Sequence, residues 1–459
     1  MSRRLIMILA LAFLVGIVYM AYAEVQDLKV SGDLTALAAN RQLSVTDLTT
    51  GTDVNKRNPS SFLGSILRLR VDANLTDNVS TSIRLLNERY WDAPDAFNDK
   101  SAIVLDLAYA QLKEFLYSPL TLTVGRQELH FGNDMVVGAR WTNNAIGATS
   151  YGFTSDPDLS VDKAFDAIRA TLNYDPLVID VIAAKIDENT LNKKDDNNLF
   201  GVYTTYALNK NIIVEPYWFL RQRQAEDSSV VAQTIGKNDD THVLGVLVRS
   251  TPVENVTVSA EGAVQLGKAA RTPNYSSVSG TGTAFSRQAP PREAFAAELG
   301  VNLAMPKVKY TPTLTALYAF FEGQHGNDTK KVTQWDPMYE NQAYGHIANA
   351  LFNQTNAHIA GVILTAKPKE DLTLKGEYYA FWWDKVYADG QNIYDLRGDL
   401  IKMTNKKFAA QELDLTAIYD YTEDVQFSLL GAILIPGNAF DKSNRKLANE
   451  VIGSMKVTF

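Results

Sequence analysis

Arginines recur at alternate positions of segments that also alternate between apolar and polar residues. Arg68 and Arg70 are interleaved with Leu67, Leu69 and Val71, and a period of two places residues on one face of a β-strand. Guanidinium groups bind carboxylates through paired hydrogen bonds and remain charged at any physiological pH. The same reasoning assigns one basic face to Arg68, Arg70, Arg84, Arg169, Arg221 and Arg223, and Arg126 joins them if its strand contains a bulge. This spacing predicts a surface that attracts anionic, carboxylate-bearing groups.

Acidic residues follow the same alternation in the second half of the chain. The acidic positions are Glu261, Glu298, Glu377, Glu412 and Asp414. If the strands close into a barrel, the basic and acidic groups face each other across the lumen, and the resulting field orients charged solutes. The alternative is mutual neutralisation that only rigidifies the barrel, for which Asp33, Asp72, Glu88 and Glu215 are well placed.

Catalytic chemistry has little support in the sequence. The five histidines are scattered and accompany neither a nucleophile elbow nor a metal-ligand spacing. The chain has no cysteine, which excludes thiolate chemistry and a cysteine-ligated zinc. Its formal net charge of −8 gives no overall basic field for nucleic acid. We therefore predict no enzymatic activity, no cofactor, no metal and no nucleic-acid partner.

Alternating segments that could position these charges run through the whole chain. We count about eighteen, with lengths that suit strands tilted across a bilayer. They cover residues 28–40, 62–75, 78–91, 103–116, 119–130, 164–173, 176–188, 197–208, 211–224, 240–250, 254–267, 293–305, 310–322, 356–367, 370–384, 408–420, 424–436 and 449–459.

The connections between these segments alternate strictly between short and long. Short turns such as Asn209–Lys210 are followed by long polar links such as 225–239 and 268–292. Outer-membrane barrels have this asymmetry, with short periplasmic turns and long extracellular loops. The sequence thus predicts an all-β, antiparallel, up-and-down transmembrane barrel of about 18 strands, with 16 as the alternative count, in the bacterial outer membrane.

The N-terminal residues predict secretion. Arg3 and Arg4 precede an apolar run from Leu5 to Met20, and Ala21–Ala23 has the small-x-small form of a cleavage site. We expect Met1–Ala23 to be a signal peptide and residues 24–459 to form a single barrel, because no linker divides them.

One stretch, Pro119–Gly132, breaks the alternation. Leu120, Leu122 and Val124 lie on one face, whereas Leu129 and Phe131 have the opposite parity. An arginine on a lipid-facing surface near the middle of the bilayer would cost about 2–4 kcal/mol. We therefore expect a β-bulge at Gly125–Gln127 that turns Arg126 into the lumen beside Arg169 and returns Leu129 and Phe131 to the outer face.

Two long links are candidates for folding into the lumen. The link from Asn133 to Lys163 carries Arg140, Trp141 and Tyr151, which suit a constriction, although a mobile extracellular loop is equally compatible with the sequence. The link from Gly323 to Asn356 carries an aromatic and amide cluster in Trp335–Asn341. This cluster suits sugar rings or a packed lid.

Several motifs resemble those of the bacterial alginate-export family of outer-membrane barrels. The stretches are PLTLTVGRQELHFG (Pro119–Gly132), KAFDAIRATL (Lys163–Leu172), WDPMYENQAYG (Trp335–Gly345) and QELDLTAIY (Gln411–Tyr419). The resemblance implies an 18-stranded barrel whose arginine-rich pore exports alginate, an anionic polysaccharide, with Arg126 and Arg169 as pore-lining residues. The negative net charge and the acidic wall depart from a uniformly basic conduit. A general or substrate-specific small-solute porin, or a plugged barrel that acts as an adhesin or scaffold, are the alternatives.

The expected partners follow from the prediction of an outer-membrane barrel. They are the lipid bilayer, an anionic or carboxylated solute or polysaccharide, and the barrel-assembly machinery. The last strand alternates Val451, Gly453, Met455 and Val457 and ends in Phe459. This pattern resembles the assembly signal of outer-membrane barrels.

Overall fold

The fold is known from a computed structural model, which describes residues 26–45, 60–91, 103–138, 153, 156–161, 164–187, 197–223, 239–269, 290–325, 330–397 and 399–459. The predicted signal peptide, Met1–Ala23, lies outside these residues. So do the predicted constriction residues Arg140, Trp141 and Tyr151.

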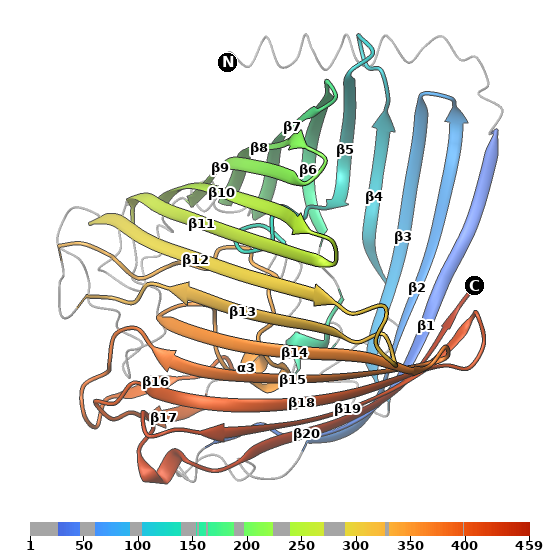
Figure 1. The fold of residues 1–459 in the computed structure, drawn as a ribbon. Helices are drawn as coiled ribbons and strands as arrows, with labels where there is room; N and C mark the ends of the chain where they lie inside the picture. Colours follow the sequence, from blue (N-terminus) through green and yellow to red (C-terminus); the bar gives the residue numbers. More distant parts are fainter. Residues whose placement is uncertain are drawn as a thin grey trace.

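Eighteen antiparallel strands form one closed sheet (Figure 1). The strands are β1 (Asp27–Gln42), β2 (Ser60–Thr76), β3 (Val79–Tyr90), β4 (Val104–Leu112), β5 (Leu120–Glu128), β6 (Ala164–Asn173), β7 (Leu177–Asp187), β8 (Asn197–Asn209), β9 (Ile212–Arg223), β10 (Asp239–Val253), β11 (Val256–Lys268), β12 (Pro291–Ala304), β13 (Thr313–Phe321), β14 (Ala357–Lys369), β15 (Leu372–Trp383), β18 (Phe408–Asp420), β19 (Val425–Pro436) and β20 (Ala448–Thr458). β1 pairs with β2 on one side and with β20 on the other, which closes the barrel. The predicted barrel is confirmed, with 18 strands and not 16.

The two faces of each strand follow the predicted alternation. On β11, Val264 and Leu266 are exposed on the outer face, whereas Glu261, Ala263 and Gln265 are buried on the inner face. The exposed side chains of the wall are mostly Leu, Val, Ile, Phe and Tyr, as a lipid-facing surface requires. Among the described residues, no helix is both long and apolar enough to cross a membrane.

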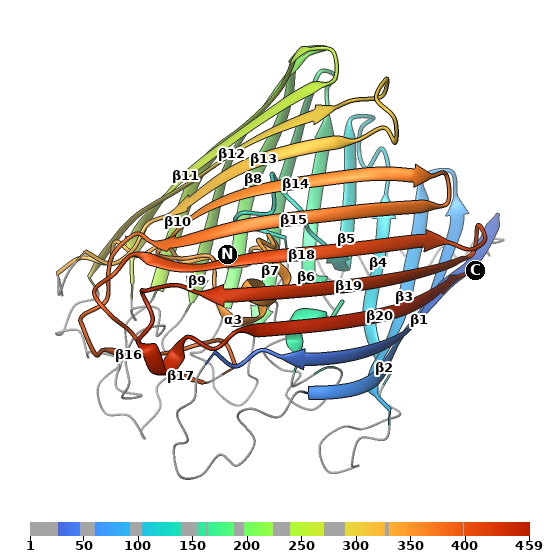
Figure 2. The same ribbon diagram turned by 60° about the horizontal axis from the view of Figure 1, so that its bottom comes forward.

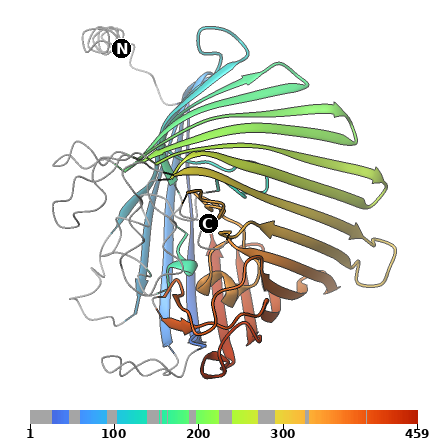
Figure 3. The same ribbon diagram turned by 90° about the vertical axis from the view of Figure 1, so that its left-hand side faces the viewer.

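The short turns gather at one end of the barrel, and the strands tilt strongly relative to its axis (Figure 3). We call this the short-turn end. The connection between β15 and β18 contains a small hairpin of β16 (Asn392–Tyr394) and β17 (Leu400–Lys402), which pairs outside the main sheet. A short helix, α3 (His346–Leu351), lies inside the wall (Figure 2).

The predicted bulge in β5 is wrong. The pairing of β5 with β6 runs in register through Gly125, Arg126 and Gln127, and the pairing of β5 with β4 runs in register through Gly125 to Arg126, where it ends. Gly125 has a φ of 124°, and an added Cβ there would lie 2.2 Å from the Ala108 carbonyl oxygen. Glycine thus supplies a backbone distortion and close approach without an extra residue.

Leu129 and Phe131 are also not on the outer face. Beyond Glu128 the chain leaves the wall and enters the barrel, where Leu129 is 0% and Phe131 5% exposed. Both belong to a buried apolar cluster with Val137, Phe165 and Tyr339. The change of parity in the sequence therefore marks the point where the strand ends and an infolded segment begins.

Three infolded segments occupy the interior. The first inner segment comprises residues 129–138, the second residues 330–356, and the third residues 156–161, which include the short helix η1 (Pro157–Leu159). Three buried apolar clusters join them to the inner wall, and α3 contacts η1. The infolded segments are thus an internal layer with its own core.

Candidate functional site

The first inner segment is fixed to the wall through Asn133. Its backbone N–H donates to Glu261 Oε2 at 3.0 Å, and its side-chain Nδ2 donates to Glu298 Oε1 at 2.9 Å. Arg249 Nη2 donates to Asn133 Oδ1 at 3.2 Å and to the Gly132 carbonyl at 2.9 Å. One asparagine therefore connects β10, β11 and β12.

Gly132 makes the turn that brings Asn133 to these strands. Its φ is 66°, and an added Cβ would lie 2.8 Å from Glu261 Oε1. Its N–H donates to the Tyr203 hydroxyl at 3.0 Å. A left-handed backbone beside a buried carboxylate requires glycine.

The first and second inner segments pair with each other inside the barrel. Val137 and Tyr339 form a parallel bridge, in which the Gly138 N–H donates to the Tyr339 carbonyl at 2.8 Å. The Asn341 N–H donates to the Asp134 carbonyl at 2.9 Å. These bonds satisfy backbone groups that would otherwise be buried without partners.

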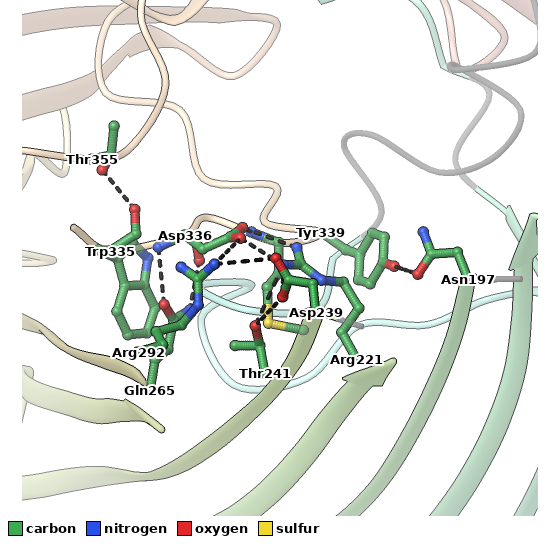
Figure 4. A network of polar contacts seen from close by, with 11 residues as sticks. Asn197, Arg221, Asp239, Thr241, Gln265, Arg292, Trp335, Asp336, Tyr339 and Thr355 are labelled. Carbon is green, nitrogen blue, oxygen red and sulfur yellow. Dashed lines mark hydrogen bonds and ion pairs between the residues drawn. The ribbon is translucent and has the colours of Figure 1, made fainter. Parts of the chain in front are cut away.

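A buried ion cluster holds the middle of the second inner segment (Figure 4). Arg221 Nη2 of β9 donates to Asp336 Oδ2 at 2.6 Å, and Arg292 of β12 lies 3.5 Å from the same oxygen. Asp239 contacts both arginines, at 3.4 and 3.5 Å. Burial alone would raise the pKa of Asp336, but the two guanidinium groups hold it well below its usual range. Asp336 is therefore an anionic anchor for this segment.

Trp335 and Tyr339 show what the aromatic cluster of this segment does. Trp335 is 0% and Tyr339 2% exposed. The Tyr339 hydroxyl donates to Asn197 Oδ1 at 3.2 Å, and the Trp335 carbonyl accepts from Thr355 at 2.6 Å (Figure 4). Of the two alternatives for Trp335–Asn341, these contacts favour the packed lid, because both rings are covered.

The acidic residues predicted to line the pore face inward, but they are buried and bonded to the inner segments. Glu298 accepts from Gln342 and from the Tyr344 hydroxyl. Glu412 accepts from the N–H groups of Ile347 and Ala348 at 2.7 and 2.8 Å. Together with Glu261, which accepts from the Asn133 N–H, these carboxylates anchor the first and second inner segments. Glu377 and Asp414 are also buried, at 6% and 0% exposed.

The third inner segment is held by a separate buried cluster around Arg41 of β1. Its guanidinium group donates to Asp156 at 2.7 Å, to Asp158 at 2.6 Å and to Glu450 of β20 at 2.8 Å. Glu88, which we expected to neutralise an arginine, accepts from Ser160 and from the Val161 N–H.

Among the described residues, four arginines of the inner face that are open to water are paired with carboxylates. Arg68 bonds to Asp33, Arg70 to Asp72, Arg169 to Asp180 and Arg249 to Glu215. Arg70, Arg169 and Arg249 lie four to six residues from the short-turn end of their strands. Asp33, Asp72 and Glu215 thus make the neutralising contacts that the alternative interpretation expected.

The remaining predicted arginines differ in position. Arg84 faces inward but is 8% exposed and bonded to Asp106 and Glu128. Arg221 is 2% exposed in the ion cluster. Arg223 is exposed at the end of β9, opposite Asn197 and Asp239.

Arg126 requires a correction, because it lies on the outer face. It stands opposite Asp166 and Ala108 in the sheet, on the same face as Val124 and Ile168, which are 40% and 52% exposed. Its Nη1 donates to Asp166 Oδ2 at 3.3 Å. An outward arginine is tolerated because it has a carboxylate partner and lies two residues from the end of β5.

Sequence reasoning missed Arg249, Arg41 and Arg292. Arg249 follows Val246 and Val248 on β10 with inward parity, a signal that could have identified it. Arg41 and Arg292 lie near the ends of their strands, where their partners come from connecting segments that show no periodicity.

Comparison with known proteins gives a family match and a set of similar structures. The family model described as alginate export matches residues 44–454. Solved structures include *Pseudomonas aeruginosa* OpdQ, with 11% identity, coverage of 95% of this chain and 98% of that one, and a TM-score of 0.54. Another is *Pseudomonas aeruginosa* OpdK with vanillate, at 10% identity, 95% and 100% coverage and a TM-score of 0.53. *Acinetobacter baumannii* OccAB3 has 10% identity, 94% and 99% coverage and a TM-score of 0.53. No curated protein sequence matches the chain.

Proposed function

The chain belongs to the alginate-export family, and from this premise we propose that its exposed lumen arginines select anionic, carboxylate-bearing solutes. The protein is a β-barrel channel of the bacterial outer membrane. By family resemblance the solute is an alginate-type polysaccharide on its way to the cell exterior. The arginines proposed for selection are Arg68, Arg70, Arg169 and Arg249.

One observation carries the anion preference. In each of these four ion pairs the arginine side chain is more accessible than its carboxylate partner, whereas in the Arg84–Glu128 pair the carboxylate is the more accessible. The exposures are 24% against 14% for Arg68 and Asp33, and 36% against 33% for Arg70 and Asp72. They are 31% against 8% for Arg169 and Asp180, and 35% against 8% for Arg249 and Glu215. A solute in the lumen therefore meets guanidinium groups that are already oriented, with donors left for a carboxylate.

A small-solute porin is the second candidate, and the inner layer favours it. The inner segments bury apolar clusters against β6–β15 and against β15–β20, which narrows the half of the lumen away from the short turns. One structurally similar protein, Pseudomonas aeruginosa OpdK, was solved with vanillate. A barrel plugged by the inner layer, serving as an adhesin or scaffold, is the third.

Planar bilayers test the selection directly. In a KCl gradient, we expect the reversal potential of the purified channel to show anion preference. The triple variant R68Q/R70Q/R169Q should move that potential toward zero, because the accessible guanidinium groups are lost. R126Q is the matched control, since Arg126 faces outward, and it should behave as the wild type.

Three outcomes would decide against the proposal. Cation preference of the wild type would contradict arginine selection. An unchanged reversal potential in the triple variant would show that these arginines do not select the solute. No conductance at all would leave the plugged scaffold as the function.

Solute size separates the first two candidates. Liposomes that contain the channel should release uronate oligomers of increasing length if it passes polysaccharide. Release of monomeric carboxylates alone would identify a small-solute porin.

We further propose that the strand ending in Phe459 is recognised by the barrel-assembly machinery. Phe459 N–H donates to the Gly32 carbonyl at 3.0 Å, and the Gly32 N–H donates back to Phe459 at 2.8 Å, at the seam where β20 meets β1. Deleting Phe459 should lower the amount of folded protein in the outer membrane. Unchanged levels would argue against this role.

A further inference from the structure

We propose that His346, Glu377 and Asp414 bind one divalent transition-metal ion, with Zn²⁺ as the probe, and that this ion fixes the second inner segment to the barrel wall. The three side chains come from different elements. His346 is the first residue of α3, Glu377 lies on β15 and Asp414 on β18. The site goes beyond the channel function, since none of its residues is among the exposed arginine pairs.

The geometry suits a single ion. One ligand atom from each of the three residues lies within 4.8 Å of the other two. Zinc binds imidazole nitrogen and carboxylate oxygen at about 2.0–2.2 Å, which draws its ligand atoms to about 3.5 Å from one another. His346 is the exposed member, so rotation of its ring can close the remaining gap.

The charges at this place are only partly compensated by the protein. Glu377 and Asp414 are direct cross-strand neighbours, and both are buried. Like charges directly opposite each other destabilise a sheet. Glu377 has the Tyr379 hydroxyl and Lys375 as partners, each at 2.9 Å. These two contacts leave Asp414 as the residue whose charge is least balanced.

Asp414 provides an independent indication of a missing ligand. The residue is 0% exposed, and its Oδ2 accepts from the His346 N–H at 3.2 Å. Its Oδ1 is buried and accepts no hydrogen bond from an N–H or hydroxyl group of the described residues, and the neighbouring polar group is the carboxyl group of Glu412. A buried carboxylate oxygen without a donor is costly, and such groups normally pair or coordinate a metal.

The ligand set identifies the class of ion. An imidazole with two carboxylates suits Zn²⁺ and related first-row ions, whereas Ca²⁺ and Mg²⁺ prefer oxygen ligands throughout. Three protein ligands leave a coordination position for water. Water can reach the ion from the side on which His346 is exposed.

The ion would join the second inner segment to the barrel wall. Glu412, two residues from Asp414, already accepts from the N–H groups of Ile347 and Ala348 in α3, the helix that begins at His346. A metal bound to His346 adds a side-chain bond between α3 and two strands. Its loss should loosen the second inner segment without altering the wall.

Metal binding to the folded channel tests the proposal. The full chain, purified in detergent without a histidine tag and treated with chelator, is titrated calorimetrically with ZnCl₂. We expect one equivalent to bind, with affinity at least tenfold weaker in H346A and in D414N. H325A is the control, because His325 contacts Glu322 outside this cluster, and it should bind as the wild type does.

A second readout does not depend on the variants. Single-channel recordings of the wild type should show higher conductance or more frequent opening after chelation, and Zn²⁺ but not Mg²⁺ should reverse the change. No stoichiometric Zn²⁺ binding by the wild type would overturn the proposal. So would wild-type affinity in both H346A and D414N, or preferential binding of Ca²⁺. None of these results depends on whether the channel prefers anions.

Discussion

Arg126 and Asp166 face each other across β5 and β6 on the outer surface of the barrel, with Nη1 and Oδ2 3.3 Å apart. Lys185 of β7 stands opposite Asp166 on the same face. A polar row thus crosses the outside of the wall close to the ends of these strands, where charged side chains cost less than at the middle of the bilayer.

The Arg126–Asp166 pair should contribute little to stability, because its side chains are 22% and 48% exposed. A double-mutant cycle with R126L, D166L and R126L/D166L should give a coupling energy below about 1 kcal/mol. The measurement is urea-induced unfolding in lipid vesicles. A coupling of several kcal/mol would place the pair in a drier environment than the outer rim.

Asn133→Ala should loosen the first inner segment. It removes side-chain bonds to Glu298 and Arg249, each worth about 1.5–3 kcal/mol when a charged partner is involved. We expect larger or noisier single-channel conductance. Asn302→Ala is the control, since Asn302 bonds to Thr315 within the wall, and its conductance should not change. Equal traces for both variants would show that Asn133 does not restrain the passage.

Asp336→Asn should be the most destabilising change in the second inner segment. It removes the carboxylate that both Arg221 and Arg292 contact, and those arginines are 2% and 1% exposed. Breaking a buried ion cluster costs about 3–5 kcal/mol. The mutant should unfold at lower temperature on heat-modifiability gels. D441N is the control, because Asp441 lies in the connection between β19 and β20. If D336N lowered the unfolding temperature no more than D441N does, the result would contradict this prediction.

Asp395 should make the β16–β17 hairpin sensitive to pH. Burial, assisted by the charge of Asp399, raises the pKa of Asp395 to about 7. Because the unfolded carboxyl releases its proton near pH 4, the folded state binds more protons between pH 4 and 7. Stability therefore falls as pH rises through this window, by at most about 1.4 kcal/mol per pH unit.

Hydrogen exchange of residues 392–402 measures this effect. Protection should be greater at pH 5 than at pH 8 in the wild type. D395N should abolish the difference, because asparagine does not titrate. Equal protection of the wild type at both pH values would mean that Asp395 is ionised throughout.

The wall could be predicted from the sequence because its pattern repeats. The predicted segments 164–173 and 408–420 coincide with β6 and β18. Each strand must present apolar side chains to lipid at every second position, and this local rule is visible without knowledge of neighbours.

The interior could not be predicted in the same way. Asp336 meets Arg221 across 115 positions of sequence, and Asn133 meets Glu298 across 165. Neither pair belongs to a periodic pattern. Arg126 was misplaced for a related reason, since its orientation depends on Asp166 in the adjacent strand and on the point where β5 ends.

The carboxylates of β11, β12 and β18 limit which substitutions the inner wall of this channel can accept. Glu261, Glu298 and Glu412 hold the infolded segments and also belong to the inner face of the wall. A lineage that acquired a more positive lumen by losing these acids would release its inner layer in the same step. Pore width and ionic preference therefore depend on the same residues. Amide or hydroxyl side chains would first have to replace these carboxylates as anchors of the inner layer.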